Sequence, residues 1–402
     1  MKMDKARISE RVGRYIPLVV VIGLFFGICL LVQTLVGGTF AGSSAYNSYT
    51  LQAMAWREGN VSLGRDYPHL ELAVYEGDWY VSFPPVPSVP LYFLTFLFGR
   101  NTPDALMVKL YALIAVIAIY TMLTRRRWNR WGAAFMALAM ALGGSMLPLI
   151  SAGAVWYQAQ VMAFMLTTAS VALMTGGNMT GSLLLYALAV GCRPFNVCYG
   201  PLLMLVWFMN KPGRTIAEAG RKLGKGIALG LCVAAAYAAY NYVRFGNPLE
   251  FGHNYLPEFV RSATGQFSLS HIVKNAKRFL IGLPLYGAEN GFAFEKFGCS
   301  VFLGNPVLLL LMIRFIRDLF GKRMNLQKVL TIVFFAVHLF LLLLHRTGGG
   351  FQLGARYAVD LVPYSLIYLG LGREERKAAW WEWAVLIAGF AFMLVGAHYV
   401  HI

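Results

Sequence analysis

Long apolar runs follow one another along most of this 402-residue chain, and polar loops separate them. A run of about 20 apolar residues is long enough for an α-helix to cross the hydrocarbon core of a bilayer. We therefore expect one all-α polytopic membrane domain over residues 1–402, a bundle of roughly eleven transmembrane helices with two large outer loops. The expected spans are residues 16–36, 104–123, 132–150, 154–174, 182–191, 197–209, 226–242, 300–313, 329–345, 358–371 and 383–398.

The distribution of charge sets the expected orientation of these helices. Residues 1–15 are basic, and the apolar run after them is too long for a cleavable signal peptide, so we expect a retained anchor with a cytoplasmic N-terminus. The loops that are then cytoplasmic hold 22 of the 35 Lys and Arg residues but only 7 of the 18 Asp and Glu residues. This positive-inside bias accounts for the net charge of +17 without a nucleic-acid partner. It indicates a multi-pass protein of the cell membrane, in contact with membrane lipids and with its C-terminus outside.

One apolar segment, residues 86–98, is only about half as long as a spanning helix. If it crossed the bilayer, the strongly basic segment 125–130 would lie outside, against the charge bias. We predict a juxtamembrane helix that lies in the outer interface or dips partway into it. The alternative is an ordinary short span.

Several classes of protein are excluded by what the sequence lacks. It contains no P-loop, no dinucleotide-binding fingerprint, no internal repeat and no soluble segment large enough to bury a core of its own. The five cysteines lie in or beside apolar runs without the spacing of metal ligands. We expect them to be packing residues and predict no metal ligands.

The first outer loop, residues 37–103, carries the clearest candidate chemistry. Asp66, His69 and Glu71 lie close together in it, beside apolar segments that could present a lipid. A carboxylate can take the proton of an acceptor hydroxyl, and a cationic group opposite can hold a departing phosphate. We favour Glu71 as the base because it lies between two apolar residues, ahead of a turn, and keep Asp66 as the second choice.

The second outer loop, residues 244–299, begins with turn-forming residues and continues with an amphipathic segment. Residues 269–283 show apolar positions at a helical period with Lys and Arg between them. This pattern predicts a helix lying on the outer membrane surface. Its basic face either meets lipid phosphates or extends to water, and the sequence leaves both interpretations open.

Two arginines lie beside apolar segments, where a charged side chain is costly unless it has a partner or faces a polar cavity. Arg193 lies between two apolar runs, where Pro194 breaks the helix, so it is expected to face a polar cavity or an ion partner. Arg356 follows a glycine-rich segment at the mouth of a span, where it could meet an anionic ligand. Alternatively, Arg356 pairs with Asp360, one helical turn later.

Four short motifs occur in an order that resembles a known family. They are GDWYVSFPPVP (77–87), CRP (192–194), YNYVRFGNPLEFGH (240–253) and GARY (354–357). Together with the N-terminal anchor, they resemble bacterial integral-membrane glycosyltransferases of the GT-C superfamily, near the protein mannosyltransferase and aminoarabinose transferase branches. The resemblance implies a GT-C fold with juxtamembrane helices and a polyprenyl-phosphate-linked sugar as donor.

The resemblance also implies where a site would lie. Its general base would be an acidic residue of the first loop. The usual position just after the first span is occupied by Gly42, Ser43, Ser44 and Asn47, which leaves Glu71 and then Asp66. The donor phosphate would meet Arg356 and Arg193. The residues expected to line the cavity are His69, Tyr80, Trp156, Gln160, Glu250 and His253.

These observations predict an inverting glycosyltransferase on the outer face of the membrane. It would move a sugar from a polyprenyl phosphate to a hydroxyl of a glycan or of a lipid-linked acceptor. A divalent cation at the carboxylates is compatible with this chemistry, although no ligand spacing requires one. Two alternatives stay open: a transporter or flippase for lipid-linked sugars, and a catalytically silent relative that binds a lipid or a partner protein.

Overall fold

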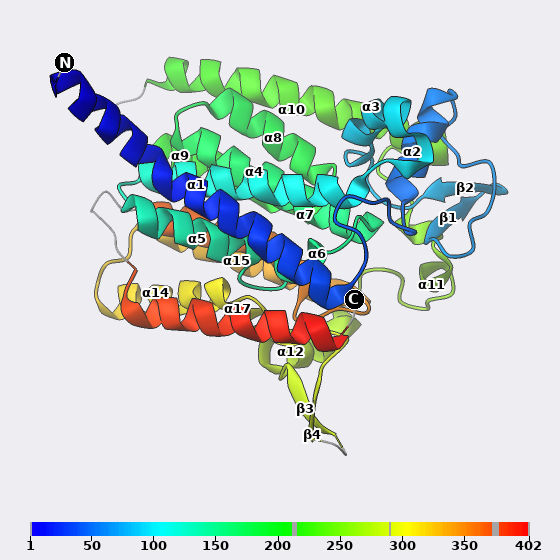
Figure 1. Cartoon of the computed structure of the whole chain (residues 1–402). Helices are drawn as coiled ribbons and strands as arrows, with labels where there is room; N and C mark the ends of the chain where they lie inside the picture. The colour runs from blue at the N-terminus through cyan, green and yellow to red at the C-terminus, as the bar shows by residue number, and fades with distance from the viewer. Residues whose placement is uncertain (1, 211–214, 289–290, 372–377, 401–402) are drawn as a thin grey trace.

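The computed structural model describes residues 2–210, 215–288, 291–371 and 378–400. Long helices lie side by side in one bundle, and short helices with a β-hairpin gather at one end of it (Figure 1). The helices are α1 (Lys2–Val36), α2 (Ser48–Arg57), α3 (Ser88–Phe98), α4 (Asp104–Arg125), α5 (Arg130–Leu142), α6 (Met146–Leu149), α7 (Val155–Thr175), α8 (Met179–Val190), α9 (Tyr199–Met209), α10 (Ile216–Phe245), α11 (Pro257–Val260), α12 (Ile272–Ile281), α13 (Val301–Gly304), α14 (Pro306–Phe320), α15 (Leu326–Leu344), α16 (Val362–Gly370) and α17 (Trp380–Val400). The 3-10 helices are η1 (Gly99–Asn101), η2 (Pro194–Cys198), η3 (His253–Tyr255), η4 (Leu269–His271) and η5 (Arg356–Leu361). Two antiparallel hairpins pair β1 (Leu72–Tyr75) with β2 (Asp78–Val81), and β3 (Leu285–Ala288) with β4 (Gly291–Phe294).

The fold class predicted from the apolar runs is confirmed, since a helix occupies each of the expected spans. Within the described ranges, six helices are long and apolar enough to cross a membrane: Tyr15–Val36, Asp104–Arg125, Val155–Thr175, Ala217–Phe245, Leu326–Leu344 and Trp380–Val400. The count of roughly eleven crossings is not confirmed. The helices at the other expected spans are shorter, for example 12 residues in α8 and 11 in α9.

Helix α7 forms the centre of the bundle. It packs against α4 and α8, and 83% of its apolar window is buried, against 6% of that of α10. Burial is required because α7 carries polar side chains that lipid could not satisfy, among them Gln158, Thr168 and Ser170. The Ser170 hydroxyl donates to the carbonyl oxygen of Ser182 on α8 over 2.8 Å, which ties the two helices together.

The short helices α8 and α9 form a hairpin whose turn is recessed below the ends of its neighbours. A helix of 12 residues rises only about 18 Å, whereas α7 and α10 are long enough to span the hydrocarbon core. Pro194 opens η2, which links the two helices, because a proline cannot continue the hydrogen-bond ladder of α8. Arg193 therefore lies at the bottom of a depression in the loop end of the bundle.

The first outer loop folds against that same end. The predicted helix at 86–98 is present as α3, which packs against α2 beside the bundle rather than within it (Figure 1). Its 11 residues rise about 16 Å, half of a bilayer core, and it exposes Phe93 and Leu97 as a lipid-facing helix would. The hairpin β1–β2 was not predicted. Glu76 and Gly77 both have positive φ, which gives its two-residue turn the twist that hairpins require.

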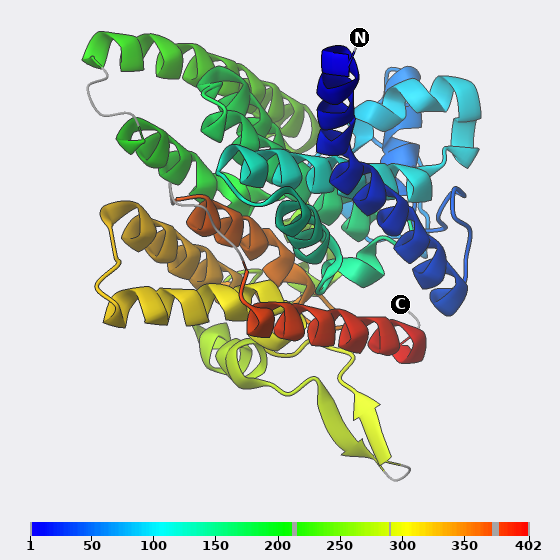
Figure 2. The same cartoon turned by 60° about the vertical axis from the view of Figure 1, so that its left-hand side comes forward.

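The second outer loop begins later than residue 244, because α10 continues through Phe245. Arg244 is buried within this helix end, where its guanidinium donates to the carbonyl oxygen of Val81 and to Asn241 Oδ1. The predicted amphipathic segment 269–283 forms η4 and α12, and the unpredicted hairpin β3–β4 projects from the bundle after it (Figure 2). The N-terminal end of α1 and the C-terminal end of α17 lie at opposite ends of the bundle (Figure 1), while the membrane side of each stays a prediction.

The glycine-rich segment before η5 packs too closely for a side chain at Gly348. A Cβ there would lie 1.9 Å from Phe279 Cζ on α12. We expect Gly348→Ala to destabilise the fold by about 1–3 kcal/mol, the usual range for overpacking, and to lower the midpoint of thermal unfolding in nanodiscs. Gly287→Ala is the matched control, because no atom lies within 4 Å of its Cβ position. Equal midpoints for the two variants would contradict the packing of α12 on this segment.

Candidate active site

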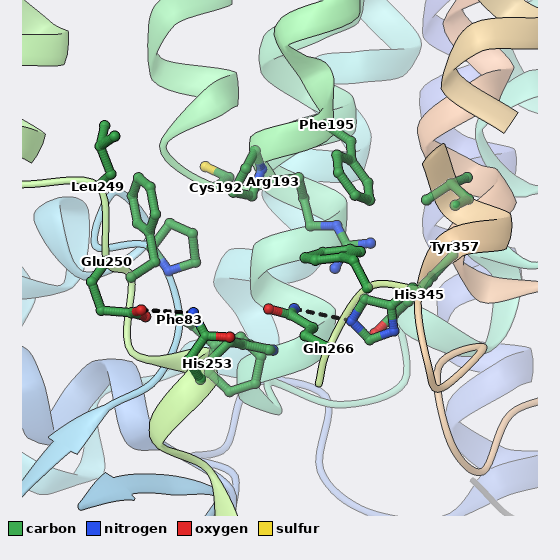
Figure 3. A pocket seen from close by; sticks show the side chains of 16 residues that line it. Phe83, Cys192, Arg193, Phe195, Leu249, Glu250, His253, Gln266, His345 and Tyr357 are labelled. Carbon is green, nitrogen blue, oxygen red and sulfur yellow. Dashed lines mark hydrogen bonds between the residues drawn. The ribbon is translucent and has the colours of Figure 1, made fainter. Parts of the chain in front are cut away.

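A cavity of about 250 Å³ opens at the loop end of the bundle, above the turn between α8 and α9. Segments far apart in the sequence enclose it: the residues after β2, the α8–α9 turn, residues 249–254 and 266–267 of the second loop, and the ends of α15 and η5 (Figure 3). Its lining residues are Phe83, Pro84, Cys192, Arg193, Pro194, Phe195, Leu249, Glu250, Phe251, His253, Asn254, Gln266, Phe267, Leu342, His345 and Tyr357. The cavity thus combines an apolar wall with a few charged and polar groups.

Arg193 contributes the cationic group of this cavity. Its Nε donates to Asp360 Oδ2 over 3.0 Å, and the ring of Tyr357 lies 4.4 Å from the guanidinium carbon. Asp360 is also held by Gln160 Nε2, which donates to Oδ1 over 2.5 Å, and its carbonyl oxygen accepts from the Tyr199 hydroxyl. The Asp360 side chain is 1% exposed and that of Arg193 is 19% exposed. The guanidinium is therefore anchored from behind by a buried carboxylate while part of it reaches the cavity.

Two histidines and a carboxylate complete the polar wall. His253 Nδ1 lies 2.6 Å from the carbonyl oxygen of Ser82, so this nitrogen carries the proton and Nε2 is left to accept. Gln266 Nε2 lies 3.1 Å from His345 Nε2. Glu250 accepts from the backbone N–H of Gly252 and from the amide of Asn254.

Burial of His253 lowers the pKa of its imidazole, although its bond to Ser82 and the nearby Glu71 act in the opposite direction. The unfolded chain takes up this proton as the pH falls below about 6.5, whereas the folded chain resists it until a lower pH. We expect the thermal unfolding midpoint to decrease as the pH is lowered from 7.5 to 5.5. In His253→Asn this decrease should be smaller. His271→Asn is the control. An unchanged pH dependence in His253→Asn would contradict a buried neutral imidazole.

Glu71 lies outside the cavity lining, directly before β1, and interacts electrostatically with His253 of the cavity wall. Its Oε2 accepts from Trp156 Nε1 over 2.9 Å, and its carbonyl oxygen accepts from the Ser82 hydroxyl. The pairing of Leu72 with Val81 places Glu71 beside Ser82, whose own carbonyl binds His253. Glu71 is exposed and therefore accessible to a substrate.

The other predicted site residues of the first loop take different positions. Asp66 is exposed, and no hydrogen bond or ion pair joins it to another residue of the described ranges. His69 is exposed, with Nε2 3.2 Å from the carbonyl oxygen of Ala45. Tyr80 does not line the cavity. Its ring is buried, with its centroid 5.2 Å from that of Phe245. Successive side chains of a strand point to opposite faces, so Tyr80 points away from the face of its neighbour Val81.

The other predicted site residues fall into two groups, those that line the cavity and those that lie outside its lining. Glu250, His253 and Arg193 line the cavity as expected, whereas Trp156 and Gln160 support it from behind through Glu71 and Asp360. Arg356 is buried outside the lining, with its guanidinium donating to the Gly349 carbonyl oxygen. Its predicted ion pair with Asp360 is absent from the described part of the chain, since Asp360 binds Arg193 instead.

Sequence reasoning missed Gln266 and His345 in the lining and Asp360 as the partner of Arg193. The two members of that ion pair lie 167 positions apart, so no local pattern indicates it. In the described ranges, no group of three or more His, Cys, Asp or Glu side chains is arranged to hold a metal ion. A cation at the carboxylates stays an untested expectation.

The fold of this chain resembles that of solved GT-C glycosyltransferases, the fold that the sequence motifs predicted. No protein-family model matches this sequence, and no curated protein is significantly similar to it. The likeness is therefore found at the level of structure.

Three solved structures define the likeness. The oligosaccharyltransferase of Archaeoglobus fulgidus in its apo form has 12% identity and a TM-score of 0.52, over 96% of this chain and 56% of that one. ArnT from Cupriavidus metallidurans, bound to undecaprenyl phosphate, has 15% identity and a TM-score of 0.52, over 94% of this chain and 63% of that one. AglB from A. fulgidus, in complex with an inhibitory peptide and a dolichol phosphate, has 12% identity and a TM-score of 0.50, over 95% and 55%. The chain thus spans little more than half the length of these proteins.

Proposed function

We propose that this protein is a membrane glycosyltransferase that moves a sugar from a polyprenyl-phosphate donor to a hydroxyl of a glycan or lipid-linked acceptor on the outer face. The fold supports the class of enzyme, since two similar structures contain a lipid phosphate. The observation that carries the proposal is the position of Arg193: a buried carboxylate fixes its guanidinium in the cavity above the α8–α9 turn, and Glu71 lies near enough to interact electrostatically with His253 of the cavity wall.

The reaction we propose is a single displacement at the anomeric carbon. Glu71 takes the proton of the acceptor hydroxyl as its oxygen forms a bond to that carbon. The bond between the anomeric carbon and the phosphate oxygen breaks, and its electron pair leaves with the lipid phosphate. One inversion follows from one displacement, so the product has the opposite anomeric configuration to the donor.

Arg193 would stabilise the charge that develops on the departing phosphate. A preorganised cation in a partly dehydrated site needs little rearrangement during the reaction, and this is a large source of rate enhancement. The Asp360 carboxylate and Gln160 amide limit the motion of Arg193. The apolar part of the lining, including Phe195 and Leu342, would receive the first units of the polyprenyl chain.

The proposal is tested with purified protein in nanodiscs and radiolabelled polyprenyl-phosphate sugars, offered with a panel of glycan and lipid-linked acceptors. We expect label to move to an acceptor, with inversion at the transferred sugar, and not to move with boiled protein. Binding of the donors without transfer to any acceptor would support the silent relative. Movement of labelled lipid between leaflets without transfer would support the flippase.

A further inference from the structure

Trp156, which donates to the Glu71 carboxylate, belongs to a chain of four neighbouring aromatic rings. We name them the aromatic platform: Tyr46, Tyr67, His69 and Trp156. Tyr46 lies 5.1 Å from Trp156 and 6.4 Å from His69, centroid to centroid, and Tyr67 lies 6.4 Å from His69. Because Trp156 donates to Glu71, the platform is attached directly to the proposed base.

The surroundings of the platform are polar and accessible. Tyr46 is 44% exposed, His69 is exposed, and the guanidinium carbon of Arg65 lies 4.7 Å above the Tyr67 ring. Rings that face lipid have apolar neighbours, as the exposed side chains of α3 do. Exposed rings mixed with charged groups are instead suited to a ligand that has both apolar and polar faces.

A second cavity, whose lining includes no charged side chain, lies beside Tyr46, two residues after the lining residue Ser44. It has a volume of about 340 Å³ and is lined by Val36, Gly37, Gly38, Thr39, Ser43, Ser44, Ala105, Ser151, Ala152 and Gly153. The backbone N–H of Tyr46 donates to the hydroxyl of Ser44, so platform and cavity adjoin. Hydroxyl and backbone groups without a charged side chain suit a neutral ligand rich in hydroxyls.

We propose that the aromatic platform and this second cavity form the acceptor site and that the acceptor is a neutral oligosaccharide. A pyranose presents a face of weakly positive C–H groups to the negative face of an aromatic ring, while its hydroxyls bind carboxylates. A sugar on the platform would bring one hydroxyl to Glu71, opposite the phosphate held by Arg193. This inference rests on the proposed function, since it names the acceptor class of the same reaction.

The test measures binding without a donor. Neutral oligosaccharides of glucose, mannose and galactose, each of four to six units, are titrated onto protein in nanodiscs and followed by saturation-transfer NMR and tryptophan fluorescence. We expect at least one to bind, Tyr46→Ala to weaken it about tenfold, and Tyr46→Phe to retain it. Tyr286→Ala, at an exposed tyrosine of β3, is the control and should bind normally.

Binding of none of the oligosaccharides, or equal binding by Tyr46→Ala and wild type, would overturn the acceptor site. Folding of Tyr46→Ala is checked by its affinity for undecaprenyl phosphate, which should be unchanged. The two proposals fail separately. Transfer to a peptide or a lipid, with no oligosaccharide bound, would contradict only the proposed acceptor site. Oligosaccharide binding without any transfer would contradict only the proposed enzymatic function.

Discussion

Replacement of Glu71 by glutamine is expected to lower the rate of sugar transfer about 10²–10⁴-fold, the range typical of a lost general base. The amide still accepts from Trp156 Nε1, so the local structure should persist while the group can no longer take a proton. Asp66→Asn should retain most activity, because Asp66 projects into solvent without a bond to the described residues. Single-turnover rates with a labelled donor measure the difference.

The control for this prediction is the thermal midpoint of each variant, which should match wild type. Equal loss in both variants would mean that neither acts specifically as the base. Full activity in Glu71→Gln together with loss in Asp66→Asn would reverse the assignment. Full activity in the double variant would remove the first-loop carboxylates from the mechanism.

Arg193→Gln is expected to cost about 10²–10³-fold in kcat, as does the loss of one donor that stabilises developing charge. The substitution also leaves Asp360 buried without its partner, which destabilises a protein by about 3–5 kcal/mol. The double variant Arg193→Gln/Asp360→Asn removes both charges. It should recover stability but not activity, which separates catalysis from folding.

Arg356→Gln provides the comparison for this position. Its guanidinium binds the Gly349 carbonyl oxygen outside the cavity, so we expect a modest effect on transfer. The transfer rates and thermal midpoints of Arg193→Gln, the double variant and Arg356→Gln show which arginine contributes to transfer. Recovery of activity in the double variant, or a greater loss in Arg356→Gln than in Arg193→Gln, would contradict the role of Arg193.

The helices could be predicted because a spanning helix requires a long continuous apolar run, which is visible in the sequence. Each apolar run became a helix, and residues 86–98 form the short helix α3, as the length of their apolar run indicated. The hairpins could not be predicted in the same way. Their strands have four residues each, too few for a periodic signal, and only the Glu76–Gly77 turn marks the first of them.

The site could be predicted only where a single residue is unusual for its surroundings, such as a charged residue between two apolar runs. Arg193 was found because a charge at membrane depth is costly. Its partner was not identified, because Asp360 was considered only as an alternative partner of Arg356, one turn along an α-helix. Residues 356–361 form the 3-10 helix η5, with three residues per turn, so position i+4 turns away from position i. Asp360 is then free to meet Arg193 from a distant segment.

The most direct test of the account is a structure of the protein in nanodiscs with undecaprenyl phosphate. We expect the phosphate within hydrogen-bond distance of the Arg193 guanidinium, with the lipid chain leaving along the apolar wall that includes Leu342. A phosphate bound at the other end of the bundle, beside Arg314 or Lys328, with the Arg193 cavity empty, would contradict it.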